Sequence, residues 1–338
     1  MNQSGYLSDD GVVKWGIIGV GDVCEKKSAP AMQIIDGSEL VAVMRRNGAK
    51  ARDYAERHNV LRWYDDADEL LDDPEINAIY IATPPHVHLA YTQKAAARGK
   101  PVYVEKPMAR TFAECEQMIA SCQQAGVPLH TAYYRRALPN FMAINNLIEK
   151  DVIGEVRSVN ITLWQALRSD DPLTFKNDWR VDPGKAGGGF FYDLASHQLD
   201  FLDFVFGEIT EAKGFVANHA GLYTANDHVT GSFKFKSGIL GTGSWCFTTS
   251  PISEIDQTTI LGSKGEISYP TFGDGHVDIK IDGSPEKRLD FEMPTHIQQP
   301  LIETIVAELL GTGMGHSPST GISGARTNWV MERLADQI

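Results

Sequence analysis

Short hydrophobic runs alternate with helical segments over the first third of the chain. Val12 to Ile18, Ala78 to Ala82 and Val102 to Val104 are nearly continuous apolar runs, which are typical of strands buried on both faces. The segments between such runs have the apolar spacing of amphipathic helices, as in Thr111 to Ala125. Because strands that alternate with helices are joined by right-handed crossovers into parallel sheets, we predict a doubly wound Rossmann domain over residues 11–134.

The pattern changes after about Pro139. A helix is expected up to Lys150, and from Val156 onward polar and apolar positions alternate in segments separated by glycine turns, as in half-buried strands. Residues 135–316 are therefore predicted to form an α+β domain, with a large open and mostly antiparallel sheet, for substrate binding and oligomerisation. Residues 317–338 are expected to form a C-terminal helix that packs back on the N-terminal domain.

Composition narrows the class of partner. The chain has 338 residues and a formal net charge of -13, which argues against nucleic acid or an anionic membrane as the main partner. It contains no apolar stretch long enough to span a bilayer. The four cysteines form no CxxC pair, and His86 and His88 lack a convincing third ligand, so we expect reduced thiols, a cytoplasmic protein and no metal site.

A glycine pair closes the first predicted strand. Gly19 and Gly21 flank Val20, and Asp22 and Val23 then open a helix. The first glycine permits a tight turn, and the second lets the backbone approach a pyrophosphate at the helix N-terminus. We assign Gly19, Gly21, Asp22 and Val23 to binding of a dinucleotide cofactor.

The end of the second predicted strand indicates which dinucleotide is bound. That end carries Arg45 and Arg46 and no carboxylate, whereas Glu39 lies at the strand's beginning. An arginine at this point can pair with the 2′-phosphate of NADP, while recognition of NAD normally uses an acid. We therefore predict a preference for NADP(H) over NAD(H), the alternative being that both arginines are plain solvated charges.

Further polar residues end the third and fourth predicted strands, where an open parallel sheet binds its ligands. Thr83 and Pro84 follow the third strand, and we group them and His88 with the cofactor-binding residues. The fourth strand runs into Glu105 and Lys106, ahead of Pro107. A lysine at this edge can hold a substrate oxygen and stabilise the charge that develops on it.

A second candidate group lies far downstream, after a triple glycine. Asp193 and His197 are four residues apart and are predicted to share one face of a helix. An imidazole titrates near neutrality, so it can exchange a proton with an alcohol while a hydride leaves or arrives. The alternative is an ordinary helical side-chain pair, and only the combination with Lys106 favours catalysis.

These motifs together resemble the glucose-fructose oxidoreductase/inositol dehydrogenase family, also called Gfo/Idh/MocA. The resemblance extends from the Gly19 loop through Glu105-Lys106-Pro107 to Asp193 and His197. It implies a Rossmann domain followed by an α+β domain whose open sheet packs in homodimers or homotetramers. It further implies that Lys106, Asp193 and His197 form the catalytic group and bind substrate, and that Glu105 lies beside the nicotinamide. By the same resemblance Trp179 and Arg180 contact cofactor or substrate, and Tyr134 and Arg135 contact substrate.

The predicted function is an NAD(P)-dependent oxidoreductase that acts on CH–OH groups of a sugar, a polyol or a related carbonyl compound. The Trp179-Arg180 pair before the glycine run is most similar to sugar reductases of the 1,5-anhydrofructose type. Three alternatives stay open: a non-catalytic NADP-binding regulator, a redox-neutral glycosidase that retains its cofactor, and a trans-dihydrodiol dehydrogenase.

Overall fold

The computed structural model describes residues 5–167, 178–313 and 315–335. The chain forms two compact units, each assembled from separate segments. The first unit contains residues up to Ala109, 113–134 and 294–324. The second contains residues 110–112, 135–293 and 325 to the C-terminus.

The described residues of the first unit contain a six-stranded sheet in the order β3-β2-β1-β4-β5-β6. Every pairing in this sheet is parallel. Its central strands are buried on both faces, which explains their nearly continuous hydrophobic sequences. The strands are β1 (Val13–Ile18), β2 (Ser38–Met44), β3 (Arg62–Tyr64), β4 (Ala78–Ile81), β5 (Val102–Val104) and β6 (Leu129–Thr131).

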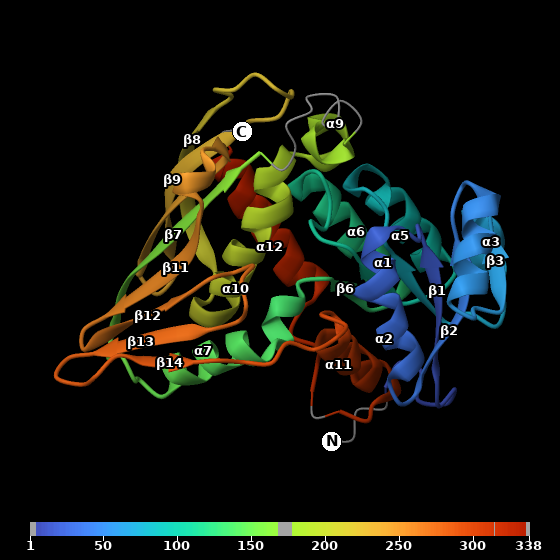
Figure 1. The fold of residues 1–338 in the computed structure, drawn as a ribbon. Helices are drawn as coiled ribbons and strands as arrows, with labels where there is room; N and C mark the ends of the chain where they lie inside the picture. Colours follow the sequence, from blue (N-terminus) through green and yellow to red (C-terminus); the bar gives the residue numbers. More distant parts are fainter. Residues whose placement is uncertain (1–4, 168–177, 314, 336–338) are drawn as a thin grey trace. The chain divides into compact units, whose positions relative to one another are not determined.

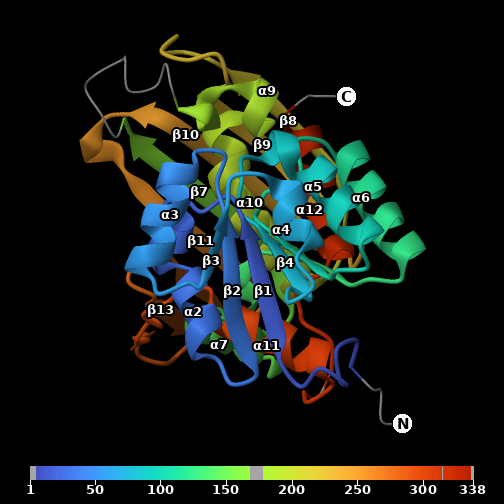
Figure 2. The same ribbon diagram turned by 90° about the vertical axis from the view of Figure 1, so that its right-hand side faces the viewer.

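Helices cover both faces of this sheet. Figure 2 shows α2 and α3 on one side of the strands and α5 and α6 on the other, as in a doubly wound fold. The helices of the unit are α1 (Asp22–Lys26), α2 (Ala29–Ile34), α3 (Gly48–Arg57), α4 (Ala67–Asp72), α5 (His88–Ala97), α6 (Phe112–Ala125) and α11 (Gln299–Leu310).

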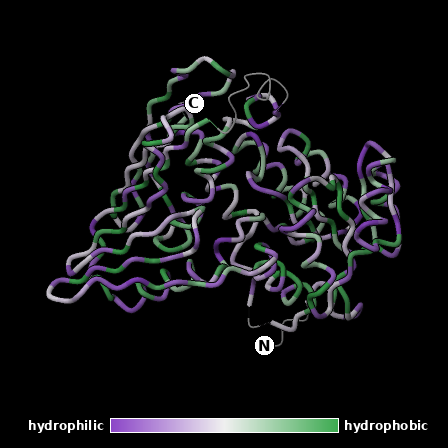
Figure 3. The backbone as a smooth tube through the Cα atoms, in the orientation of Figure 1, coloured by the Kyte–Doolittle hydropathy of each residue, from purple (hydrophilic) through white to green (hydrophobic). Residues whose placement is uncertain are grey.

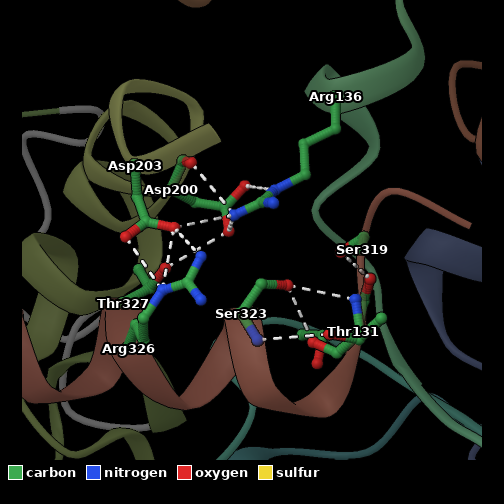
Figure 4. Close-up of polar contacts among 9 residues, drawn as sticks. Thr131, Arg136, Asp200, Asp203, Ser319, Ser323, Arg326 and Thr327 are labelled. Carbon is green, nitrogen blue, oxygen red and sulfur yellow. Dashed lines mark hydrogen bonds and ion pairs between the residues drawn. The ribbon is translucent and has the colours of Figure 1, made fainter. Parts of the chain in front are cut away.

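The C-terminal part of the chain is divided between the two units. One segment of the first unit ends at Tyr134, the second unit resumes at Arg135, and residues 294–324 return to the first unit. Here Ser319 Oγ donates to the carbonyl of Thr131 at the end of β6, at 2.7 Å (Figure 4). Helix α12 (Gly321–Leu334) begins in this unit, but its residues from 325 onward belong to the second unit. Within the described residues, 317–324 thus belong to the first unit and 325–335 to the second.

The described part of the second unit contains an eight-stranded sheet in the order β14-β13-β12-β11-β7-β10-β9-β8. All pairings are antiparallel except that of β7 with β10. Together with the first sheet, this arrangement confirms the predicted fold class. The strands are β7 (Val156–Ala166), β8 (Ile209–Ala217), β9 (His228–Phe235), β10 (Leu240–Thr249), β11 (Ile255–Gly262), β12 (Gly265–Tyr269), β13 (Val277–Ile281) and β14 (Lys287–Leu289).

One face of this sheet is covered by α7 (Pro139–Glu149), α10 (Ser196–Phe206) and the second part of α12 (Figure 1). Along β7 and β10 buried and exposed residues alternate, and the hydropathy of the strands changes along their length (Figure 3). Trp245, fully buried on β10, donates its indole N–H to Gln198 of α10 at 2.7 Å. A Cβ on Gly214 would lie 2.2 Å from the carbonyl oxygen of Leu334, so glycine lets α12 pack directly on the strand backbone.

Candidate active site

The glycine loop brings two strand ends of the first unit together. Gly19 has a φ of +97°, and a Cβ there would lie 2.5 Å from the side chain of Thr83. A larger residue would therefore both strain the turn and separate β1 from the β4 end. A Cβ on Gly21 would meet nothing within 4 Å. The loop thus leaves open space at Gly21, the residue just before Asp22 and Val23 open α1, as a dinucleotide requires.

The two arginines after β2 have different surroundings. Arg45 donates from Nη1 to the carbonyl of Val20, 3.1 Å away in the glycine loop. Its guanidinium therefore fixes the loop. Arg46 is exposed. It stands just before α3, whose first turn contains no acidic residue and whose Asn47 cap accepts from Lys50 N at 3.1 Å. The carboxylate of Asp65 lies 3.0 Å from the position that a Cβ on Gly48 would take.

His88 is enclosed within the first unit. It is 0% exposed at the start of α5, after the 3-10 turn Pro85–Val87. One ring nitrogen faces the carbonyl of Thr83 at 2.7 Å and the other faces the carbonyl of Met108 at 3.0 Å. Burial lowers the pKa of His88, and these two carbonyls act in the opposite direction. The side chain thus joins the loops after β4 and β5, and its assignment to cofactor binding stays a prediction.

Glu105 is also held from within the protein. It is 7% exposed, and its Oε1 accepts from the Tyr80 hydroxyl at 2.6 Å and from the Gln298 amide at 2.7 Å. Its Oε2 accepts from the backbone N–H of Lys106 at 3.1 Å. The side chain of Lys106 is half-buried, and the Lys106–Pro107 bond is cis. The carboxylate therefore orients the chain at the lysine.

The second unit holds the other candidate catalytic residues. Asp193 lies in a π-helical turn, Phe191–Ala195, that precedes α10, and His197 is the second residue of α10. This wider turn replaces the regular α-helix that was predicted to put both on one face, and such turns are frequent at functional sites. Asp193 Oδ2 lies 3.5 Å from Arg180 Nε, and the Arg180 guanidinium stacks 4.7 Å from the Trp179 ring. Asp193, Arg180 and Trp179 thus form one cluster.

His197 belongs to a neighbouring cluster around Phe272. The imidazole is 3% exposed and meets the Phe272 ring edge-on at 5.8 Å. The guanidinium of Arg135 stacks on the same ring at 4.5 Å, and its Nε donates to the carbonyl of Thr271. Asp256 accepts from the N–H groups of residues 271 and 272, and burial raises its pKa. Phe272 and Asp256 are thus part of the surroundings of two candidate residues, and no sequence motif indicated them.

Buried charged residues anchor α10, the helix that carries His197 (Figure 4). Arg136, on the 3-10 turn Tyr134–Ala137, makes two 2.8 Å hydrogen bonds to the carboxylate of Asp200. Arg326 of α12 donates to Asp203 at 2.5 to 3.1 Å. Burial raises the pKa of Asp200 to about 6. Two of the expected substrate elements, the turn with Arg135 and the helix with His197, are therefore tied to each other.

Each unit assembles its own half of the expected residues. The first brings together Gly19, Thr83 and the residues around Lys106, and the second brings together Arg135 with His197, and Arg180 with Asp193. Tyr134 is the last residue of its segment in the first unit and is 7% exposed. Within the described ranges, no group of three His, Cys, Asp or Glu could hold a metal. None of the described helices is long and apolar enough to cross a bilayer.

Two family models match the chain. Residues 13–133 match a model described as an oxidoreductase family with an NAD-binding Rossmann fold. Residues 141–268 match the model of the GFO/IDH/MocA C-terminal domain. The two matches correspond to the parallel sheet of the first unit and to much of the open sheet of the second.

Individual proteins agree with these matches. Oxidoreductase P35 of Formosa agariphila is 38% identical over 298 residues, which cover 88% of this chain and 91% of that protein. The 1,5-anhydro-D-fructose reductase of Ensifer adhaerens is 28% identical over 238 residues, 70% of each chain. Among solved structures, the aldose-aldose oxidoreductase of Caulobacter crescentus complexed with glycerol has a TM-score of 0.83 at 23% identity, and covers 96% of this chain and 98% of its own.

Proposed function

Because the chain belongs to the Gfo/Idh/MocA oxidoreductase family, we propose that it moves a hydride between nicotinamide and a sugar, a polyol or a related carbonyl compound. The similarity to a 1,5-anhydro-D-fructose reductase supports a sugar-like substrate. The observation that carries the proposal is the glycine loop beside Thr83 and the Lys106 strand end in a single Rossmann sheet.

The residues of the first unit fit a dinucleotide. Gly19 admits the close approach of two strand ends, and the space at Gly21 is open up to 4 Å. Gly19, Gly21, Asp22 and Val23 would hold the pyrophosphate through backbone N–H groups, and Thr83 and Pro84 would flank the nicotinamide end. When bound, the nicotinamide supplies the hydride acceptor or donor.

The coenzyme we propose is NADP(H). Arg46 is exposed and Lys50 lies in the first turn of α3, so two cations stand near the expected 2′-phosphate. Arg45 contributes indirectly, because its guanidinium is engaged by the Val20 carbonyl. The competing group is Asp65, whose carboxylate lies against Gly48 at the start of α3 and would suit the ribose hydroxyls of NAD. Two cations near one carboxylate favour binding of the 2′-phosphate of NADP(H) over the ribose hydroxyls of NAD(H).

Three side chains would share the proton transfer, the stabilisation of charge and the orientation of the substrate. During oxidation of an alcohol, His197 would accept the hydroxyl proton, and Lys106 would stabilise the charge that develops on the substrate oxygen. Asp193 would orient the substrate together with Arg180, with which it is paired at 3.5 Å. Tyr134, Arg135 and Trp179 would set the fit of the substrate. Such acid–base groups contribute about 10²–10⁴-fold to rate.

The protein is further proposed to form homodimers or homotetramers through the outer face of the open sheet. The outward residues of the central strands are mostly uncharged, among them Asn160, Thr162, Thr242 and Ser244. Phe215, 74% exposed, adds a large apolar group. A broad uncharged surface with an exposed aromatic ring suits a protein partner better than solvent, and a second copy of the same sheet presents a matching surface.

The experiment is a nicotinamide absorbance assay with NADPH and NADH on a panel of sugars, polyols and a trans-dihydrodiol. We expect turnover with at least one sugar-like substrate. Lys106→Met and His197→Asn should each lower kcat by about 10² or more, while binding of NADPH, followed by its fluorescence, is retained. The controls Lys14→Met and His316→Asn change an exposed ion-paired lysine and histidine and should leave turnover unchanged.

Two results would reject this function. Tight NADPH binding without turnover on the whole panel would favour a non-catalytic regulator. Full turnover in both the Lys106 and the His197 variants would exclude the proposed chemistry even if the wild-type chain is an enzyme.

A further inference from the structure

A short segment near the C-terminus reaches the candidate lysine through two buried side chains. Gln298, just before α11, is 0% exposed. Its Nε2 donates to Glu105 Oε1 at 2.7 Å, and its Oε1 accepts from the Tyr103 hydroxyl at 2.8 Å. Glu105 in turn accepts from the N–H of Lys106. Gln298 is thus two hydrogen bonds away from the lysine backbone, although 193 residues separate it from Glu105.

The direction of each hydrogen bond is set by chemistry. A carboxylate only accepts, so the Gln298 amide must turn its NH₂ toward Glu105 and its oxygen toward Tyr103. Burial raises the pKa of Tyr80 and Tyr103 well above the usual value, so both hydroxyls keep their proton and donate. Among the described residues, three donors therefore reach the Glu105 carboxylate, and they fix the direction of both oxygens.

The same segment holds the helix that follows the glycine loop. The backbone N–H of Gln298 donates to the carbonyl of Lys27, the residue that ends α1, at 3.0 Å. His296 Nδ1 faces the carbonyl of Lys26 at 2.7 Å. These carbonyls have no partner further along α1, because the helix ends there. Residues 296–298 therefore brace two neighbouring parts of the cofactor edge, the α1 end and the Lys106 strand end.

We propose that Gln298 is a positioning residue for Lys106: through Glu105 it fixes the lysine for proton and charge handling, without touching substrate or cofactor. The role in turnover rests on the proposed function, whereas the effect on the lysine itself does not. Loss of the amide leaves Glu105 Oε1 with Tyr80 alone. The carboxylate then has more freedom to turn, and the backbone N–H of Lys106 that it accepts is held less firmly.

The test compares Gln298→Met with Gln299→Met. Methionine keeps the volume and length of glutamine and removes its hydrogen bonds. Gln299 is the next residue, and its amide donates to Glu303 one turn along α11. It is therefore a matched control. The first readout is the rate of acylation of Lys106 by a small amine-reactive acylating reagent at one fixed pH, followed by peptide mass spectrometry. The second is kcat and KM with the best substrate of the panel.

In Gln298→Met the rate of Lys106 acylation should rise about threefold, because a lysine that is held less firmly meets the reagent more often, and kcat should fall about tenfold with KM within about twofold. Gln299→Met should match the wild type in both. Tyr80→Phe, which removes the other donor to the same oxygen, should change the acylation rate in the same direction and provides the test if Gln298→Met does not fold.

The outcomes separate the two proposals. A raised acylation rate in a chain that turns over no panel substrate would retain the positioning role and reject the proposed function. An unchanged acylation rate in both Gln298→Met and Tyr80→Phe would overturn the positioning role, whatever the turnover of the wild-type enzyme.

Discussion

The buried charges below α10 provide a quantitative test of how the second unit holds its candidate residues. Arg136 and Asp200 have side chains that are 3% and 1% exposed, and Asp203 is 2% exposed. Arg136 bridges both carboxylates, since its Nη2 also lies 3.5 Å from Asp203. We consider the substitution Arg136→Met, which keeps the apolar stem and removes the guanidinium.

The expected cost follows from the charge left behind. Removing one partner of a buried ion pair typically destabilises a protein by about 3–5 kcal/mol, because the remaining charge is uncompensated. In Arg136→Met, the Asp200 carboxylate loses both hydrogen bonds from the guanidinium and keeps the one from the Thr327 hydroxyl, at 3.2 Å. For a unit of this size each kcal/mol corresponds to about 2–4 °C, so the melting temperature of the second unit should fall by roughly 10 °C at pH 8.

The loss should depend on pH, with a definite sign. The pKa of Asp200 is already raised to about 6 in the folded protein, chiefly by burial, from 3.8. A group whose folded pKa is raised contributes stability that is present at low pH and is lost as the pH rises through the folded value. Arg136 lowers this pKa, so its removal raises it further. Folded Arg136→Met therefore takes up a proton above pH 6, where the wild type is still ionised, and its stability deficit should shrink between pH 8 and pH 5 by about 1–3 kcal/mol.

The assay is thermal and urea unfolding at pH 8 and pH 5, with two further variants. Arg157→Met breaks an ion pair of the same unit whose side chains are 59% and 73% exposed, and should cost less than about 1 kcal/mol at either pH. Arg136→Met combined with Asp200→Asn removes both charges, and should recover much of the stability and lose the pH dependence. A deficit in Arg136→Met that is equal at both pH values, or no larger than that of Arg157→Met, would refute the reasoning.

Two further predictions concern the cofactor and the open sheet. Arg46→Ala should raise KM for NADPH by about 10-fold or more, as expected for loss of a charge-assisted hydrogen bond, and should leave KM for NADH nearly unchanged. Asp65→Asn should change neither KM by that amount. Equal kcat/KM of the wild type for NADPH and NADH would reject the preference. Thr242→Glu should convert the oligomer to monomers in light scattering, because symmetry brings added charges into one interface, while Ile252→Glu, at a 94% exposed position, should not; a wild-type chain of monomeric mass at micromolar concentration would contradict the interface.

Much of the fold could be predicted because local pattern and buried environment agree. The run Val102 to Val104 was predicted as a strand, and it is buried on both faces. Strand β3, Arg62–Tyr64, was not predicted, because it has no fully buried residue and therefore no apolar run to reveal it. The resemblance drawn from the glycine loop, the Glu105-Lys106-Pro107 motif and the Asp193/His197 pair is confirmed by both family models.

The environment of each candidate residue was less predictable than its identity. His88 was placed among the cofactor-binding residues from its position after β4, but its ring is enclosed by two carbonyls. The π-helical turn at Phe191–Ala195 changes what four-residue spacing means for Asp193 and His197, and nothing in the local sequence distinguishes it from an α-helix. Such features depend on contacts between residues that are far apart along the chain. Hydrophobic patterns and short motifs do not show which of these residues meet.

The two buried networks show why motifs alone do not determine activity. Glu105 depends on Gln298, 193 residues away, and Asp200 depends on Arg136, 64 residues away. A buried carboxylate without its donors is costly, so each network fixes its element strongly as long as both ends are present. A chain that keeps Lys106 but loses Gln298 would still fold a Rossmann sheet and bind dinucleotide, since the glycine loop is intact, yet it would hold its lysine less firmly. The rate of turnover should therefore depend on the distant polar partners, whereas cofactor affinity should depend on the local glycine motif.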